Sequence, residues 1–488
     1  MTHRRLCIAF ALAAAHAAES AAQPPVESTR VRPADSTAAS GPLPADSIAR
    51  PRAPLVPTPS PLRGLYVNRW AALADKMFRL IDVAKRTEVN ALVIDVKDDR
   101  GYLLYPSRVP LAREIGADSR AVTPMSHARL RAILDTMRAH GIYPIARIVV
   151  MKDPILAKKK IEWSIKRKSD GQPWLDKSGN PWVDPHHDGA WNYAADLAEE
   201  AIDLGFSEVQ LDYVRFPDER RLVREAAFPL AAGRGRAQVI GQQIGAVRDR
   251  LRPLGVPLTI DVFGLTTSDS TDMGIGQRWE QFIDKADVVL PMTYPSHYAP
   301  GSYRIAHPNG NPYAVIDKAL KDAKRRSEGI VGAAKVIPWY QDFTLGKPRY
   351  GVAEVRAQMK AGYDNGIDSW ILWNPGSNYT VAALRAEGEA RNADSVAASA
   401  RADAAARDSA AQRDAAAARD STTGRDTTIA RDSARQDFTR RVDSLAGRDT
   451  TARRDTGSAR DTVRRPDSTT GRGAPPRPGS VPPPAGPR

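Results

Sequence analysis

Short hydrophobic runs alternate with longer segments of helical spacing along the middle of this 488-residue chain. Each run is rich in β-branched and aromatic side chains, which is typical of buried β-strands. Eight runs occur, at residues 64–70, 91–98, 143–150, 208–215, 257–264, 287–294, 335–341 and 369–374.

The segments between the runs have the spacing of amphipathic helices. Residues 72–87 and 127–140 show it most clearly, and their apolar stripes are Leu73, Met77, Leu80, Ile81 and Ala84, and Leu130, Ile133, Leu134 and Met137. Glycines that permit a left-handed helix cap precede several runs, at Gly141, Gly205, Gly255 and Gly366. Eight repeats of strand and helix predict an α/β fold, the closed (β/α)8 TIM barrel. An open doubly wound sheet is the alternative, but no glycine-rich phosphate loop follows the first run.

The composition changes at both ends of this core. All nine tryptophans lie between Trp70 and Trp373, and no lysine follows Lys360. Residues 23–61 are rich in Pro, Ser and Ala, and residues 391–488 repeat Arg-Asp-Ser and Arg-Asp-Thr units before a proline-rich end. Such segments cannot bury enough apolar surface to offset their chain entropy. We therefore expect one folded domain at residues 62–390 between a disordered linker and a disordered tail.

The first residues have the pattern of a signal peptide. Two arginines precede an apolar run from Leu6 to Ala15, and small residues follow to Ala22. The run is too short to span a bilayer, so we expect residues 1–22 to be removed and the mature protein to be periplasmic or extracellular, with no transmembrane segment. The only cysteine, Cys7, would leave with them, which excludes thiol chemistry and disulfides in the mature chain.

The net charge of +14 does not by itself indicate nucleic acid as a partner. Much of the excess is arginine in the tail, where it alternates with aspartate, and a mixed polyampholyte has little long-range field. We expect no nucleic-acid partner, and we expect a monomer.

Three acidic residues interrupt the apolar runs near the ends where a barrel places its active site. They are Asp95, Asp212 and Asp261, and the two-residue alternation of strands lets all three face the barrel axis. Asp212 and Asp261 are the expected catalytic pair, because glycoside hydrolysis needs one protonated and one ionised carboxyl group. The structural alternative for Asp212 is a salt bridge inside the barrel with Lys97 or Arg147. Asp95 is expected either as a third, supporting acid or as a salt-bridge partner of Lys97.

Polar and aromatic residues at the same strand ends are candidates for substrate binding. We expect Trp339 and Trp373 to hold sugar rings, and Tyr294, Arg215 and Gln341 to orient the acids and the substrate hydroxyls. Asn68 and His297 complete the expected site. No cofactor and no metal are expected, because the adjacent His186 and His187 lack the spacing of metal ligands.

Several of these stretches together resemble a bacterial family of glycosyl hydrolases that lies near the α-amylase-like barrels. The stretches are Arg-Gly-Leu-Tyr-Val from Arg63, Ile-Asp-Val-Lys-Asp-Asp-Arg-Gly from Ile94, Ala-Arg-Ile-Val-Val-Met-Lys-Asp-Pro from Ala146, Trp-Val-Asp-Pro from Trp182, Val-Gln-Leu-Asp-Tyr-Val-Arg-Phe-Pro from Val209 and Val-Leu-Pro-Met-Thr-Tyr-Pro-Ser-His-Tyr from Val289. The resemblance covers about residues 63–384 and implies a barrel that cleaves O-glycosidic bonds.

The resemblance implies a nucleophile at Asp212 and a general acid at Asp261. The chain departs from the α-amylase-like pattern at two positions, since Gln210 replaces an arginine and Asp261 replaces a glutamate. Asp269 or Asp272 in the following loop are therefore alternative acids.

Two further functions stay open beside an exported glycoside hydrolase that acts on a poly- or oligosaccharide. One is a non-catalytic barrel that binds carbohydrate of the cell envelope, and the other is a metal-dependent hydrolase on the same fold. Strand-end acids that face an open cleft would favour the enzyme, whereas acids locked in salt bridges under a closed rim would favour the binding barrel.

Overall fold

The computed structural model describes residues 54–119 and 124–386, and isolated positions between 388 and 413. The predicted signal peptide, most of the predicted linker and most of the predicted tail lie outside the described residues. The chain separates into two units after Ala400, and the barrel belongs to the first.

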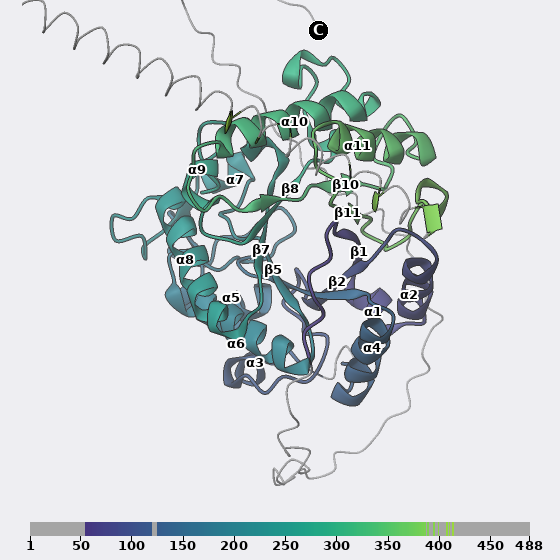
Figure 1. Cartoon of the computed structure of the whole chain (residues 1–488). Helices are drawn as coiled ribbons and strands as arrows, with labels where there is room; N and C mark the ends of the chain where they lie inside the picture. Colours follow the sequence, from purple (N-terminus) through teal and green to yellow (C-terminus); the bar gives the residue numbers. More distant parts are fainter. Residues whose placement is uncertain are drawn as a thin grey trace, which may run out of the picture. The chain divides into compact units, whose positions relative to one another are not determined.

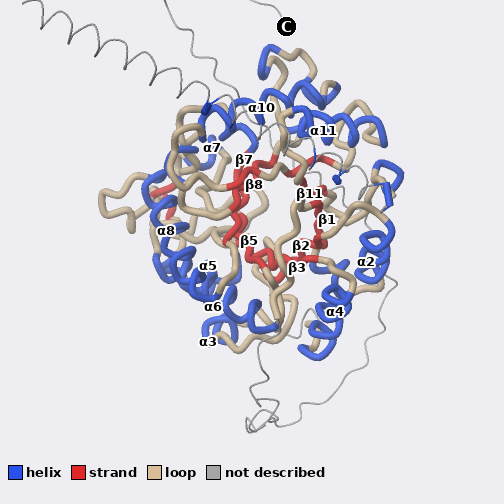
Figure 2. Tube along the Cα trace, in the orientation of Figure 1, coloured by secondary structure: helices blue, strands red, loops and turns tan. Residues whose placement is uncertain are grey.

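Parallel strands form one sheet that closes on itself, with helices around it (Figures 1 and 2). The strands are β1 (Arg63–Val67), β2 (Ala91–Lys97), β3 (Tyr143–Val149), β5 (Glu208–Asp212), β7 (Leu258–Phe263), β8 (Val288–Met292), β9 (Lys335–Val336), β10 (Trp339–Gln341) and β11 (Trp370–Trp373). β9 and β10 both pair with β8, and β10 pairs with β11, which closes the ring onto β1. The predicted (β/α)8 barrel is therefore confirmed.

The strands end earlier than several of the predicted runs. β5 ends at Asp212, because Tyr213 adopts a φ of 54°, which is incompatible with an extended strand. The run at residues 335–341 is split into β9 and β10 at Pro338, whose nitrogen cannot donate to a ladder.

The α-helices surround the sheet (Figure 2). They are α1 (Arg69–Leu73), α2 (Lys76–Arg86), α3 (Pro110–Ile115), α4 (His127–Ala139), α5 (Pro154–Lys159), α6 (Asp188–Leu204), α7 (Arg220–Val223), α8 (Arg236–Leu251), α9 (Trp279–Phe282), α10 (Pro312–Ser327) and α11 (Val352–Asp364). The stripe predicted for residues 127–140 is buried on α4 as expected. In the segment predicted at 72–87 the main helix, α2, begins only at Lys76, and Leu73 ends α1 instead.

Two apolar layers hold the barrel together. The larger one lies between strands and helices, and a smaller one fills the inside of the ring with side chains such as Val93, Ile145, Leu290 and Ile371. Residues 54–62 contribute Val56 and Leu62 to the inner layer, although residues 54–61 fall in the predicted linker. The Val56 backbone N–H donates to Ser207 Oγ at 2.9 Å, so this proline-rich segment lies against the start of β5.

A small antiparallel pair, β4 (Lys166–Arg167) with β6 (Ala226–Ala227), connects the loops that follow β3 and β5. Short 3-10 turns follow other strands, among them η4 (Gly264–Thr267), η5 (Pro295–His297), η6 (Ser302–Arg304) and η7 (Pro308–Gly310). Within the described residues no helix is both long and apolar enough to cross a membrane.

Candidate active site

Four charged side chains meet inside the barrel near the carboxyl ends of its strands. Asp95 comes from β2, Arg147 from β3, Asp212 from β5 and Asp261 from β7. All four residues are buried, and Asp212 is the most exposed of them at 5%. The predicted convergence of the three acids is therefore observed, since each contacts or approaches the same guanidinium group.

Arg147 is the centre of this cluster. Its Nη1 donates to Asp95 Oδ1 at 2.5 Å, and its Nη2 donates to Asp212 Oδ2. Arg147 Nε lies 3.1 Å from Asp212 Oδ2 and 3.9 Å from Asp261 Oδ2. Those two oxygens can therefore be no more than about 7 Å apart, near the lower limit of the spacing of inverting glycosidases and compatible with that of retaining ones.

The position of Arg147 accounts for one departure from the α-amylase-like pattern. Arg147 and Gln210 are register partners on the neighbouring strands β3 and β5. The guanidinium that the pattern places two residues before the strand-four acid therefore comes from the adjacent strand in this chain. Gln210 instead donates from Nε2 to Asp261 Oδ2 at 2.8 Å.

Asp261 is held by two neutral donors, Gln210 and Trp339. Trp339 Nε1 donates to its Oδ1 at 2.6 Å. Burial raises the pKa of Asp261 well above its usual range, and the negative charge of Asp212 raises it further. Gln210 Oε1 is buried and has no hydrogen-bond partner among the described residues. Rotation of this amide would give a protonated Asp261 an acceptor.

Asp95 is bound by Arg147 and by Tyr66, whose hydroxyl donates to Asp95 Oδ2 at 2.6 Å. Burial raises the pKa of Asp95 to about 6. The alternative pairing with Lys97 is wrong: a register irregularity in β2 lies between the two residues, and Lys97 Nζ binds Asp153 Oδ2 at 2.8 Å.

Asp212 is positioned from two sides. Arg147 holds Oδ2, and the backbone N–H of Tyr213 donates to Oδ1 at 2.5 Å. Tyr213 adopts the left-handed conformation that costs an ordinary residue about 1 kcal/mol. This strained turn points the Tyr213 N–H back at the carboxylate and so fixes its orientation.

Aromatic rings form one wall of the cluster. Tyr66 and Trp373 stack with centroids 4.0 Å apart, and Trp339 meets Trp373 edge to face. The Arg147 guanidinium lies 5.3 Å from the Tyr66 ring and 5.4 Å from the Trp373 ring. Burial and the charges of Asp261 and Asp212 raise the pKa of the Tyr294 hydroxyl, which stays neutral. Trp339, Trp373 and Tyr294 therefore lie beside the acids, with Trp339 bonded to Asp261 and Trp373 stacked on Tyr66. That the two indoles hold sugar rings stays a prediction.

The other predicted binding residues have partners of their own. Arg215 pairs with Asp218 at 3.1 Å and lies over the rings of Tyr213 and Phe263. Gln341 accepts from the Ser296 N–H and donates to the Phe343 carbonyl.

Asn68 and His297 are also held by protein contacts. Asn68 caps α1 through the Ala71 N–H and donates to the Pro375 carbonyl at 2.8 Å. Burial lowers the pKa of His297 to about 4, so its ring is neutral near pH 7.

The alternative loop acids lie in local turns. Asp269 Oδ1 accepts from the Thr271 N–H and hydroxyl, and Asp272 Oδ1 accepts from the Gly274 N–H. Neither makes a contact with the cluster among the described residues.

Metal ligation finds no support in the described residues, which contain no group of three or more metal-ligating side chains. His186 binds Asp184 through Nδ1, and His187 caps α6 and stacks on Trp163.

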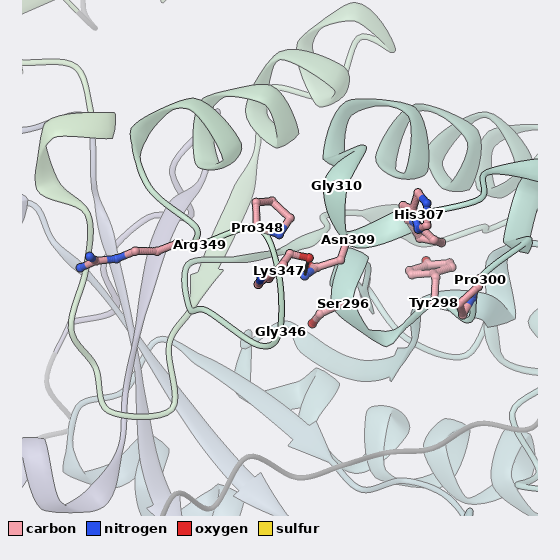
Figure 3. Close-up of a pocket in the computed structure, with 11 residues that line it drawn as sticks. Ser296, Tyr298, Pro300, His307, Asn309, Gly310, Gly346, Lys347, Pro348 and Arg349 are labelled. Atoms are coloured by element: carbon pink, nitrogen blue, oxygen red, sulfur yellow. Dashed lines mark hydrogen bonds between the residues drawn. The ribbon is translucent and has the colours of Figure 1, made fainter.

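A cleft of about 870 Å³ opens beside His297, between the loops that follow β8 and β10 (Figure 3). Its volume is in the range of small-ligand sites. Tyr298, Pro300 and His307 lie on one side of it, and Asn309 and Lys347 on another, while Arg349 points away from the group. No acidic side chain is among the described residues that line it.

Arg147 is the partner that the structural alternative for Asp212 named, and the structure contains that salt bridge. Tyr66 and Gln210 are contacts that the predicted site does not include. Both point inward on their strands, as the three acids do, so the alternation that identified the acids could also have identified them. An arginine inside an apolar strand is as costly to bury as an acid, and it indicates a partner for one.

Comparisons with known proteins place the chain in a family. A family model described as "putative glycosyl hydrolase domain" matches residues 64–379. Among solved structures, the chain is similar to a hypothetical protein from Ruminiclostridium thermocellum, with 35% identity over 41% of this chain and 97% of that chain and a TM-score of 0.36.

More distant likenesses include the PgaB (BpsB) glycoside hydrolase domain from Bordetella bronchiseptica, with 14% identity over 65% of this chain and 94% of that chain and a TM-score of 0.47. The chitobiase of Flavobacterium johnsoniae is 12% identical over 64% of this chain and 44% of that chain, with a TM-score of 0.42. No curated protein matches the chain. Because the family model spans more than half of the chain, from the first barrel strand past the last, the chain belongs to this family of glycosyl hydrolases.

Proposed function

We propose that this glycosidase is an exported, retaining enzyme that cleaves poly- or oligosaccharides with Asp212 as nucleophile and Asp261 as general acid. The observation that carries the proposal is the contrast between two neighbouring carboxyl groups. Asp212 is ion-paired with Arg147, whereas burial and the Asp212 charge raise the pKa of Asp261. One ionised and one protonated carboxyl group at short range are what glycoside hydrolysis needs.

The two carboxyl groups divide the first chemical step between them. Asp212 attacks the anomeric carbon and forms a glycosyl ester, while Asp261 protonates the departing glycosidic oxygen as its bond to that carbon breaks. Asp261, now ionised, then takes a proton from water, whose oxygen attacks the anomeric carbon and releases Asp212. The oxygen limit of about 7 Å favours this double displacement, because most inverting enzymes need more space for the water.

Arg147 and Asp95 support the nucleophile. The guanidinium neutralises part of the charge that three acids would concentrate in one buried place. Asp95, itself held by the Tyr66 hydroxyl, binds Nη1 of Arg147. This contact leaves Nη2 and Nε of Arg147 directed at Asp212. We assign Asp95 a positioning role.

The second candidate is a barrel that binds carbohydrate without cleaving it, and one observation favours it. The carboxylate of Asp212 is engaged by Arg147 and Tyr213, and the acids are almost fully covered. An Arg–carboxylate contact does not remove nucleophilicity, however, since the other lone pairs of the oxygens remain available. A raised pKa beside a fixed negative charge has no evident use in simple binding and favours the enzyme.

The cleft beside His297 supports a substrate longer than one sugar. It opens at the same barrel end as the acids, and Ser296 in its wall binds Gln341 at the end of β10. Export rests on the predicted signal peptide at residues 1–22, and removal of those residues in the mature protein would support it.

The test is hydrolysis by the full chain of chromogenic glycosides and of a polysaccharide panel, read as released reducing ends. Asp212→Asn is the matched variant, because it removes one charge without changing the shape. We expect turnover to fall by at least about a thousandfold while the variant stays folded, because Arg147 keeps its ion pair with Asp95. Binding without cleavage by the wild type would support the second candidate instead.

A further inference from the structure

Trp70 differs from the other tryptophans of this protein. Trp70 is 56% exposed to solvent, whereas the remaining eight tryptophans are buried or half-buried. Single exposed apolar residues are common and need no explanation by themselves. Two further features distinguish Trp70: its position at one end of the barrel and the contact of its indole with Arg69.

Trp70 lies at the barrel end that carries the acids. It belongs to α1, which follows directly on the carboxyl end of β1. Asn68 caps this helix and binds the Pro375 carbonyl in the loop after β11, so α1 is fixed to the rim. Tyr66, four residues before Trp70 and on β1, donates a hydrogen bond from its hydroxyl to Asp95.

A buried arginine holds the indole in place. The Arg69 guanidinium lies 4.6 Å from the centroid of the Trp70 ring and 5.5 Å from that of the half-buried Tyr102. Arg69 is itself fixed by Asp98, which accepts from Nε at 2.8 Å. Its Nη1 has no hydrogen-bond acceptor among the described residues, so the aromatic faces are the groups that stabilise this part of the cation. The ring is therefore oriented before any ligand arrives.

Phe78 provides a comparison on the outside of the barrel. It is 47% exposed on α2, next to another exposed position, Arg79. It lies in the middle of an outer helix and not at a strand end. Phe78 is thus an aromatic residue with an exposed fraction similar to that of Trp70, at a position where we expect no substrate.

We propose that Trp70 is a platform for a sugar ring of the substrate, at a subsite outside the point of cleavage. The inference rests on the proposed function and adds to it a substrate class, an oligosaccharide long enough to reach from the acids to the rim. A flat, rigid indole face packs on the C–H face of a pyranose ring with little loss of side-chain entropy. The contact needs no charge on the sugar.

The test is binding of the full chain to a printed array of oligosaccharide series of increasing length, with Trp70→Ala, Trp70→Phe and Phe78→Ala beside the wild type. Trp70→Ala should weaken binding to the longer members by about fivefold to tenfold, as expected for one aromatic contact. The shortest members that bind should be affected less than about twofold, Trp70→Phe should be intermediate, and Phe78→Ala should match the wild type.

Three outcomes would overturn the proposal: Trp70→Ala equal to the wild type, an equal loss at every length, or no binding of any glycan by the wild type. Asp212→Asn on the same array separates the two proposals. If it binds like the wild type and also keeps full turnover, the catalytic assignment fails and the Trp70 subsite stands.

Discussion

The two ends of β5 each direct an acid into the barrel, and their surroundings differ. Asp212, at the carboxyl end, shares a guanidinium with Asp95 and lies near Asp261. Glu208, at the amino end, makes no ion pair among the described residues: Thr259 Oγ1 donates to its Oε1 at 2.7 Å, and Oε2 has no hydrogen-bond partner there.

The amino end of the barrel is also closed by the chain itself. Thr58, in the segment that precedes β1, is 3.0 Å from the Tyr143 hydroxyl, which donates to the Ser207 carbonyl. Burial raises the pKa of Glu208 to about 7; the Thr259 hydrogen bond and the positive charge of Lys335 lower it, and the negative charge of Asp287 raises it further. One strand thus carries an acid paired with a cation at the carboxyl end, where barrels place their active sites, and a partly protonated acid at the closed end.

The largest effect is expected for Asp261→Asn. Turnover of substrates with poor leaving groups should fall by about a hundredfold to ten-thousandfold, because the amide cannot protonate the leaving oxygen. Dinitrophenyl glycosides need no such proton and should lose far less. In the wild type, activity should decline as rising pH removes the proton from Asp261, whose pKa is raised, and the variant should lack that decline. Equal losses on both substrate types would contradict the assignment.

Arg147→Met should cost stability as well as activity. The substitution leaves Asp95, Asp212 and Asp261 without their shared cation, and removal of one partner of a buried ion pair costs about 3–5 kcal/mol of unfolding free energy. The loss should be smaller at pH 5 than at pH 8, because Asp95, with a pKa of about 6, is then protonated.

Arg147→Lys is the matched control for urea unfolding, since it keeps a charge and should lose less than the methionine variant. A methionine variant as stable as the wild type would show that the acids do not depend on Arg147.

Glu208→Gln should have the smallest effect. The folded-state pKa of about 7 lies above the ordinary value of 4.5, so the folded protein holds a proton that the unfolded chain releases between these values. Wild-type stability should therefore decrease from about pH 4.5 to pH 7 because of this group, and the glutamine variant should gain relative to it by about 2–3 kcal/mol at pH 8 compared with pH 4.5.

Turnover of Glu208→Gln should stay within about twofold of the wild type, since residues at the amino end of a barrel contribute to its stability and not to catalysis. A difference in unfolding free energy that is independent of pH would show that Glu208 ionises normally.

The sequence predicts the barrel well because its evidence is local and repeated. Strands such as β2 consist mostly of apolar residues, as expected for a strand covered on both faces, and the apolar residues of α4 recur with helical spacing. The strand ends are less predictable, because Tyr213 leaves the strand by a left-handed turn that no residue preference indicates. The proline-rich residues 54–61 have the composition of a linker, yet Val56 packs against the inner apolar layer of the barrel.

The candidate site is predictable in part, for a different physical reason. The alternation of side chains along each strand identifies Asp95, Asp212 and Asp261 as inward-facing. It does not show which residues on neighbouring strands lie side by side. Which acid binds Arg147 depends on the register between β2, β3 and β5 and on the irregularity beside Asp95. The roles of Gln341 and Asn68 also depend on distant backbone groups, the Ser296 N–H and the Pro375 carbonyl, which a single sequence does not reveal.

The most direct test of the account is covalent labelling of the nucleophile. The full chain would be reacted with an activated 2-deoxy-2-fluoro glycoside of the sugar found by the hydrolysis screen, which slows release of the glycosyl ester, and its peptides measured by mass spectrometry. We expect one fluoroglycosyl group on Asp212, located by fragmentation of its peptide because Glu208 lies only four residues away, and none on Asp95, Glu208 or Asp261. A label on any of those other acids, or none while the enzyme still hydrolyses the compound, would contradict a retaining mechanism through Asp212.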